Sequence, residues 1–317
     1  MKLDTIVVGM DFSDNAIHSA VWVSRCVAPN AEITLLHVID LPHRPHFTPV
    51  SVPSRNTIER AARDFAELQM AKVTALLTEN VVHCEVRVGK PHEEIPKLAK
   101  ERGADLIVVG PHSSRSRRRA RLGTTADRLV RTSVIPVLVG MDLPVNAPRR
   151  LLVPIEDAPI TPAVLDAARS LAQRFGAEVL LLNVWSNAEY SYVASIANAT
   201  AANEAEAKRE VERDLKVAAR TWLEQFAKDG VARERVRAVV TYGSVGDSIL
   251  QAAKAIDADL IVMGGRGSGF VAPALLGSSV ASVLHGATCP VLVVREPTTP
   301  LSNASADDDA LRATHRA

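Results

Sequence analysis

An internal repeat constrains the fold of this 317-residue chain more than any other feature of its sequence. Residues 103–110 read GADLIVVG and residues 257–264 read DADLIVMG, a displacement of 154 positions. The same displacement relates Gly89 to Gly243, and it relates IPVLV at residues 135–139 to CPVLV at residues 289–293. Near the start of each copy the displacement is about 145, since residues 4–13, DTIVVGMDFS, correspond to residues 150–158, RLLVPIEDA. Several segments in register indicate two consecutive copies of one domain.

Each copy alternates short apolar runs with helical patterns. In the first copy, continuous β-branched runs predict strands buried on both faces at residues 5–8, 33–39, 84–88, 106–109 and 134–139. Helical patterns fall near residues 14–27, 57–79, 92–102 and 123–132. In the second copy, Thr161 and Pro162 predict the start of a helix, with Thr161 as its N-cap, and Gly176 predicts a left-handed cap at its end. This alternation predicts an α/β fold with two tandem doubly wound parallel sheets, each of about five strands.

The boundaries between the copies follow from composition. Residues 140–149, GMDLPVNAPR, carry prolines and small residues between two apolar strands, as a linker does. We therefore expect a first domain at residues 1–141, a linker at 142–149 and a second domain at 150–296. Residues 302–317 are polar and acidic with little to bury, so we expect residues 297–317 to be a disordered tail.

The overall composition excludes several classes of protein. With 47% hydrophobic residues, each copy can bury a core, while 37 Lys and Arg against 36 Asp and Glu create no global field that favours nucleic acid or an anionic membrane. The N-terminus does not resemble a signal peptide, and no stretch of about 18 residues is apolar enough to span a membrane. The cysteines Cys26, Cys84 and Cys289 lack CxxC and zinc-ligand spacing, which is typical of reduced thiols in a cytoplasmic protein.

A glycine-rich segment follows one strand of the second copy. Residues 264–270 read GGRGSGF, and residues 277–279 read GSS and lead into a helix. Open parallel sheets bind ligands beyond the carboxyl ends of their strands. Glycines let the backbone approach phosphate oxygens, and a helix N-terminus with serine hydroxyls favours an anion. The segment therefore predicts a phosphate site in the C-terminal copy.

The spacing of this segment resembles the ATP-binding signature of universal stress proteins. That signature is glycine, two residues, glycine, nine residues, glycine, then Ser or Thr, and Gly264, Gly267, Gly277 and Ser278 match every position. The resemblance covers nearly the whole chain, including VVGMDFS at the end of the first strand and the final CPVLVV. It implies a tandem, UspA-like universal stress protein with an adenine nucleotide alpha hydrolase-like fold. It also implies an intramolecular pseudo-dimer, in which the two domains pair through their last strands as single-domain members do between chains.

The resemblance implies ATP, with Mg²⁺, as the ligand of the C-terminal copy. Gly264 and Gly267 would line the triphosphate beside Arg266, and the backbone of Val184 would meet the adenine. Glu156 departs from the pattern, because ATP-binding members commonly carry Asp there, and this puts the ribose or metal side of the site in question. The residues assigned to this site are Pro154, Ile155, Glu156, Val184, Met263, Gly264, Arg266, Gly267, Gly277, Ser278 and Ser279.

The first copy carries a degenerate form of the motif, in which Ser113 replaces the second glycine. A Cβ at this place costs strain or distance to a phosphate. Five arginines in SRSRRRARL at residues 114–122 either replace the lost backbone contacts through bidentate pairing or form a solvated basic loop. The run lacks the interleaved aromatic residues of a nucleic-acid site. The residues assigned to the first copy are Gly9, Met10, Asp11, Val38, Gly110, His112, Gly123, Thr124 and Thr125.

These features favour a regulatory nucleotide-binding protein over an enzyme. No Walker lysine follows the glycines, and no base and nucleophile are paired in the sequence, so efficient phosphoryl transfer is not expected. Two alternatives stay open: a nucleotide-free interaction module, and an enzyme with slow ATPase activity or autophosphorylation on a loop Ser or Thr such as Ser278. A role in the stress response comes only from the resemblance. Whether the N-terminal pocket binds nucleotide and whether tandem chains form a homodimer also stay open.

Overall fold

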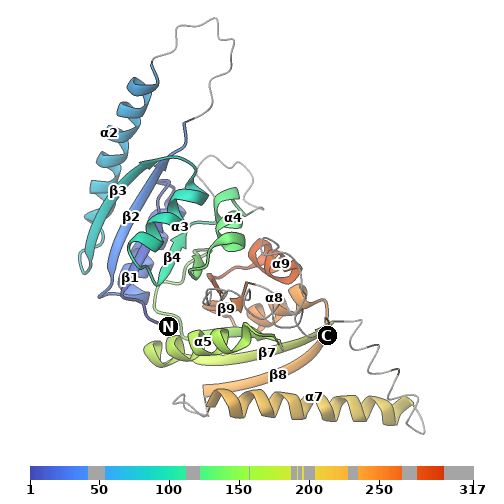
Figure 1. Cartoon of the computed structure of the whole chain (residues 1–317). Coiled ribbons are helices and arrows are strands. Elements are labelled where there is room, and N and C mark those ends of the chain that lie inside the picture. The colour runs from blue at the N-terminus through green and yellow to red at the C-terminus, as the bar shows by residue number, and fades with distance from the viewer. Residues whose placement is uncertain are drawn as a thin grey trace, which may run out of the picture.

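The computed structural model describes residues 1–41, 54–111, 122–156, 158–186, 191, 195, 204–227, 235–265 and 277–295. These residues form an α/β structure around one ten-stranded sheet with the strand order β3-β2-β1-β4-β5-β10-β9-β6-β7-β8 (Figure 1). The first half of the chain contributes the strands from β3 to β5, and the second half contributes those from β10 to β8. Helix α2 lies beside β3 at one end of the sheet, and α7 lies along β8 at the other end (Figure 1).

The elements of the two halves follow the same order. The first half contains β1 (Thr5–Gly9), α1 (Asp14–Trp22), a π-helical turn η1 (Val23–Val27), β2 (Glu32–Ile39), α2 (Arg55–Thr74), β3 (Val81–Val88), α3 (Pro91–Glu101), β4 (Leu106–Val109), α4 (Thr124–Thr132) and β5 (Val137–Val139). The second half contains β6 (Arg150–Ile155), α5 (Thr161–Phe175), β7 (Glu178–Ser186), α7 (Glu204–Ala227), β8 (Val236–Gly243), α8 (Val245–Ala255), β9 (Leu260–Gly264), α9 (Ser278–Gly286) and β10 (Val291–Val294). The predicted α/β fold class is confirmed.

Two local predictions need correction. The last strand of the first half begins at Val137 rather than Val134, because the Ser133 hydroxyl donates to the Ile135 carbonyl and accepts from the Ile135 N–H in a local turn. Val134 is accordingly exposed. Helix α5 begins at Thr161, which is therefore not the N-cap.

The residue before it, Ile160, takes the N-cap position of α5 without a side-chain hydrogen bond. The Thr161 hydroxyl instead donates to the carbonyl of Glu156, at the end of the preceding strand. The predicted left-handed cap is confirmed, since Gly176 has a φ of 61°.

The two halves join through an antiparallel pair of strands in the middle of the sheet. Strand β5 pairs with β10 so that Val139 faces Val291 and Val137 faces Val293. Each half is otherwise parallel, and the strand order of the second half is the reverse of the first. The pseudo-dimer expected from the resemblance is confirmed.

Two apolar cores lie on opposite faces of the sheet, and each core contains residues of both halves. On one face, under α1, α2, α5 and α7, Ile6 and Leu151 belong to the same cluster. On the other face, under α3, α4, α8 and α9, Val7 and Leu152 belong to the second cluster. Neighbouring residues of a strand point to opposite faces, so the central strands are buried on both sides, as their continuous apolar sequences predicted. The halves therefore share their cores.

The segment between the halves packs against the first helix. Residues 142–149 form neither helix nor strand. The indole Nε1 of the buried Trp22 donates to the Asn146 carbonyl at 3.1 Å, and the Cys26 thiol lies 3.6 Å from the Val145 carbonyl. These contacts support our proposal of domains at residues 1–141 and 150–296 with a linker at 142–149. The tail expected at residues 297–317 lies outside the described residues.

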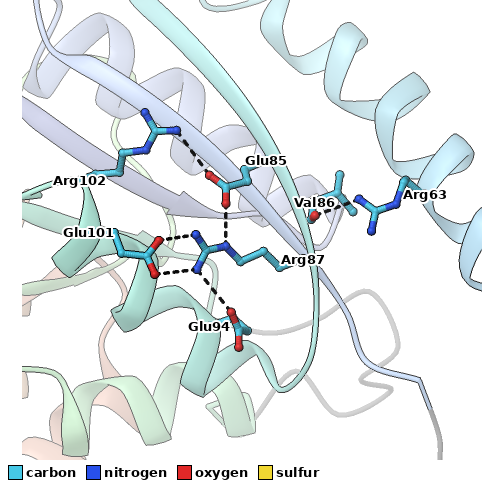
Figure 2. Close-up of polar contacts among 7 residues, drawn as sticks. All are labelled: Arg63, Glu85, Val86, Arg87, Glu94, Glu101 and Arg102. Atoms are coloured by element: carbon cyan, nitrogen blue, oxygen red, sulfur yellow. Dashed lines mark hydrogen bonds and ion pairs between the residues drawn. The ribbon is translucent and has the colours of Figure 1, made fainter.

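Strand β3 is an edge strand, and a helix side chain covers part of its edge (Figure 2). The Arg63 Nη1 atom of α2 donates to the Val86 carbonyl at 3.1 Å. Free carbonyls on an edge strand invite pairing with another chain. Arg63 therefore occupies one of the groups through which a further strand could add.

An ion-pair network on the other side of β3 ties the strand to α3 (Figure 2). The Arg87 guanidinium contacts Glu85 at 2.6 Å, Glu94 at 3.4 Å and Glu101 at 2.5 Å. The hydrogen bond from Arg87 holds the pKa of Glu101 below its ordinary value, and the same contact raises the pKa of Arg87. One arginine thus contacts three carboxylates from two elements, β3 and α3.

We predict that Arg87→Met lowers the free energy of unfolding by about 1 kcal/mol at pH 7, because solvent still screens this partly buried network. Since the folded pKa of Glu101 lies below its ordinary value of 4.5, the stabilisation is present above that value and is lost as the pH falls through the folded pKa. Urea denaturation at pH 7 and at pH 3 measures this difference. Arg102→Met is the matched control with a smaller effect, because it removes a 3.5 Å contact to Glu85 and the weakest of the influences that lower the pKa of Glu101. Equal destabilisation by Arg87→Met at both pH values would contradict the ion-pair account.

The three free cysteines differ in exposure, and this predicts their reactivity. Cys84 is exposed, Cys26 is partly buried and Cys289 is buried. Burial, with added repulsion from Asp259, raises the pKa of the Cys289 thiol to about 12. Burial also raises the pKa of Cys26.

We predict one fast thiol in a titration of the folded protein with Ellman's reagent at pH 8, because only thiolates react. Cys84→Ser should remove the fast phase, and Cys289 should react only after unfolding in urea. Rapid modification of all three thiols in the folded protein would contradict the burial of Cys289.

Candidate functional site

The carboxyl ends of the central strands of the second half meet at one edge of the sheet. In the parallel register, Ile155 of β6 lies opposite Asn183 of β7, and Leu152 of β6 lies opposite Ile261 of β9. The residues predicted from these strand ends are therefore brought to one edge. They are Pro154, Ile155, Glu156, Val184, Met263 and Gly264.

Side-chain hydrogen bonds fix the main chain where β6 ends. The Asn183 Nδ2 atom donates to the Ile155 carbonyl at 2.8 Å. The Glu156 carbonyl accepts from the Ala158 N–H at 3.0 Å and from the Thr161 hydroxyl. The partly exposed Glu156 thus follows a strand end whose backbone is held by β7 and α5.

Gly264 has a packing role that the sequence interpretation missed. A Cβ on Gly264 would lie 3.0 Å from Ile160 Cγ2 and 3.4 Å from Val164 Cγ2. The absence of a side chain therefore lets α5 approach the end of β9. The preceding Met263 is buried. Close approach of a helix explains Gly264 whether or not a phosphate contacts it.

The N-terminus of α9 forms the second described part of the glycine motif. Gly277 is the N-cap, with φ −57° and ψ 142°, and no side chain among the described residues caps the helix. Ser278 is exposed and Ser279 is partly buried. The first N–H groups of a helix lack intrahelical partners and carry a partial positive charge. The end of α9 is thus suited to an anion. Arg266 and Gly267, between the two parts, lie outside the described residues.

The equivalent edge of the first half holds its acidic residue in a turn. Asp11 Oδ1 accepts from the Ser13 N–H at 3.0 Å and from the Ser13 hydroxyl at 2.6 Å. Ser13 in turn caps α1 by accepting from the Ala16 N–H at 3.2 Å. The Asp11 carboxylate is therefore oriented by the start of α1.

A pair of equivalent residues, His37 and Asn183, was missed by the sequence interpretation. The His37 Nδ1 atom lies 2.7 Å from the Met10 carbonyl, as Asn183 bonds to Ile155 in the second half. Because a carbonyl only accepts, Nδ1 carries the proton. The His37 ring also packs against Phe12, with centroids 4.6 Å apart, and Phe12 has a φ of 60°. The sequence could have indicated both residues, because each directly precedes a predicted site residue, Val38 or Val184.

The remaining residues predicted in the first half lie at strand ends or at the start of α4. Met10 and Val38 are buried. A Cβ on Gly9 would lie 2.9 Å from Ile95 Cδ1, and one on Gly110 would lie 3.3 Å from the Ala16 nitrogen. Both glycines therefore allow close helix packing.

Helix α4 begins as α9 does. Gly123 is its N-cap without a side-chain hydrogen bond, and the Gly123 N–H donates to the Pro111 carbonyl at 2.7 Å. Thr124 is exposed and Thr125 is partly buried. His112 and the arginine-rich run lie outside the described residues.

The described residues contain no group of three or more His, Cys, Asp or Glu side chains that could hold a metal ion. Their helices include none that is long and apolar enough to cross a bilayer.

Comparison with known proteins identifies the family. The family model described as "Universal stress protein family" matches residues 2–139 and again residues 148–295. The universal stress protein Rv2005c of Mycobacterium tuberculosis is 27% identical over 309 residues, which cover 93% of this chain and 98% of that protein. A universal stress protein of Mycolicibacterium smegmatis is 28% identical over 305 residues, covering 92% and 96%.

A solved structure supports the same fold. The crystal structure of a universal stress protein from Archaeoglobus fulgidus matches with a TM-score of 0.65 and 21% identity, covering 93% of this chain and 97% of that one. The repeated fold, the two matches of one family model and the nearly full-length relatives agree. The chain belongs to the universal stress protein family and carries two consecutive copies of its domain.

Proposed function

We propose that this protein binds ATP, together with Mg²⁺, as a regulatory ligand, mainly in its C-terminal half. The observation that supports this most is the N-terminus of α9, where the N-cap Gly277 makes no side-chain hydrogen bond. The glycine motif connects this N-terminus to the end of β9 at Gly264. Only the second half keeps both glycines of the first part of that motif, Gly264 and Gly267. In this proposal the chain between Gly264 and Gly277 surrounds the phosphates.

The N-terminus of α9 would receive the phosphates. Gly277 brings no side chain to the N-cap position, so it leaves the N–H groups of the first turn available to an anion as far as the described residues are concerned. The exposed Ser278 adds a hydroxyl donor. Together with the helix dipole, these donors favour a group with negative charge.

The ends of β6 and β7 would receive the adenosine. Val184 lies one residue beyond Asn183, whose amide fixes the end of β6, so the two strand ends keep a constant spacing. A fixed backbone edge suits a planar base, because the base must meet its partners without reorganisation. Glu156 follows Ile155 at the same edge and would face the ribose or the metal.

The residues present fit Mg²⁺ as a companion of the phosphates. Mg²⁺ in nucleotide sites is bound by one or two carboxylates, by phosphate oxygens and by water. Glu156 supplies one carboxylate at the strand end, so a larger acidic cluster is not required. When bound, the ion would neutralise phosphate charge.

We propose binding without efficient turnover. The glycine motif of the second half contains Arg266 but no lysine in the place where a P-loop enzyme carries one. Function would then come from the change in stability or partner choice that a bound ligand brings. A cytoplasmic location and a role in the stress response are part of this proposal.

We predict that Gly277→Asp weakens ATP binding by about tenfold or more, because the carboxylate repels phosphate at the same N–H groups. The fold should survive, since the φ of Gly277 suits any residue and Asp is a preferred N-cap. Isothermal titration calorimetry with Mg²⁺, on protein stripped of ligand, measures the affinity.

The matched control is Gly123→Asp, at the equivalent N-cap of α4. It should leave binding unchanged if the C-terminal site dominates. Equal loss from both changes would show that both halves bind, and no binding by the unaltered protein would overturn the proposal in favour of an interaction module. Release of phosphate by the unaltered protein at a measurable rate would favour the slow ATPase.

We predict that Glu156→Gln weakens ATP binding in the presence of Mg²⁺ more than in EDTA, because only the metal complex uses the carboxylate. Calorimetry under both conditions gives the ratio. An equal loss in both would assign Glu156 to the ribose instead of the metal.

A further inference from the structure

Arg295, the residue after β10, contacts both halves of the molecule. Its Nη2 atom donates to the Val130 carbonyl on α4 of the first half. Its guanidinium also lies against Gly265 of the second half, where an added Cβ would be 2.8 Å from Arg295 Cζ. We propose that Arg295 is a positioning residue that ties the start of the second-half glycine motif to α4.

The contact on α4 satisfies a buried group. Helix α4 ends at Thr132, so its last four carbonyls have no partner within the helix. The Leu129 carbonyl accepts from the N–H of the C-cap residue Ser133 at 2.9 Å. Val130 is fully buried, and a buried carbonyl needs a hydrogen-bond partner. A cation at the C-terminal end of a helix also matches its dipole. Arg295 therefore stabilises the end of α4 from the other half.

The contact on Gly265 depends on the absence of a side chain. The Gly265 N–H donates to the Val294 carbonyl at 3.0 Å, which holds this residue beside the end of β10. The Cζ, Nε and Nη1 atoms of Arg295 would all lie within 2.9 Å of an added Cβ. Any larger residue must therefore move the guanidinium, and with it the bond to Val130.

The two halves differ at these positions, so the contact of Arg295 with the other half has no symmetric counterpart from the equivalent residue of the first half. The displacement of 154 relates Arg295 to Met141 and Gly265 to Pro111. The methionine side chain has no N–H donor, and a proline ring occupies space that a glycine leaves open. At this pair of equivalent positions, a guanidinium therefore reaches across the β5–β10 junction from the second half, toward the helix whose first residue is Thr124.

The bridge is tested first without any ligand, by hydrogen exchange of the amides in residues 124–133. Arg295→Met should speed exchange in the last turn of α4 by about tenfold, as expected for loss of one charged hydrogen bond. Gly265→Ala alone should also speed exchange in the last turn of α4. Combined with Arg295→Met, it should change the exchange rate little further. Similar circular dichroism spectra would show that the variants fold.

The matched control is Arg235→Met, because Arg235 also donates to a main-chain carbonyl, that of Gly176 at 2.6 Å, but does so within the second half. It should leave exchange in α4 unchanged. Unchanged exchange in Arg295→Met, or an equal effect of Gly265→Ala in both backgrounds, would overturn the inference.

A second arm rests on the proposed function. Adding Mg²⁺ and ATP should slow exchange in α4 in the unaltered protein, and this response should be lost in Arg295→Met. If calorimetry detects no ATP binding, the proposed function fails. The ligand-free comparison of the single and double variants then still decides the role of Arg295. If ATP binds and α4 responds equally in both proteins, Arg295 does not carry the connection.

Discussion

The antiparallel pairing of β5 with β10 is the interaction on which the rest of the architecture depends. It converts two five-stranded sheets into one sheet of ten, and it places the apolar side chains of both halves in the same two cores. Without it, each half would expose an apolar strand edge and part of both cores, a combination that promotes aggregation. Each half therefore covers a strand edge and part of the cores of the other.

Most of the fold could be predicted from the sequence because the signals are local and repeated. Continuous apolar runs such as LIVV and LIVM predicted the buried strands. The displacement of 154 predicted that the second half repeats the fold of the first. The errors arose where a single side chain redirects the backbone. Ser133 holds Ile135 in a turn, and Thr161 bonds back to Glu156 instead of capping its helix. Such choices depend on which acceptor is near in space.

The candidate site could be predicted only in part, for a related reason. The glycine spacing located the end of β9 and the start of α9, but not why Gly264 lacks a side chain, since Ile160 and Val164 are distant in sequence. The Arg87 network and the contacts of Arg295 likewise join residues from separate elements. Spacing along a chain carries no information about such contacts.

Joining the two copies in one chain also changes what substitutions can do. In a dimer of identical subunits every substitution appears twice, on both sides of the symmetry axis. A pair such as Gly265 with Arg295 on one side and Pro111 with Met141 on the other could not exist there. Covalent fusion therefore frees each half to vary alone, so that one can specialise while the other keeps an architectural role.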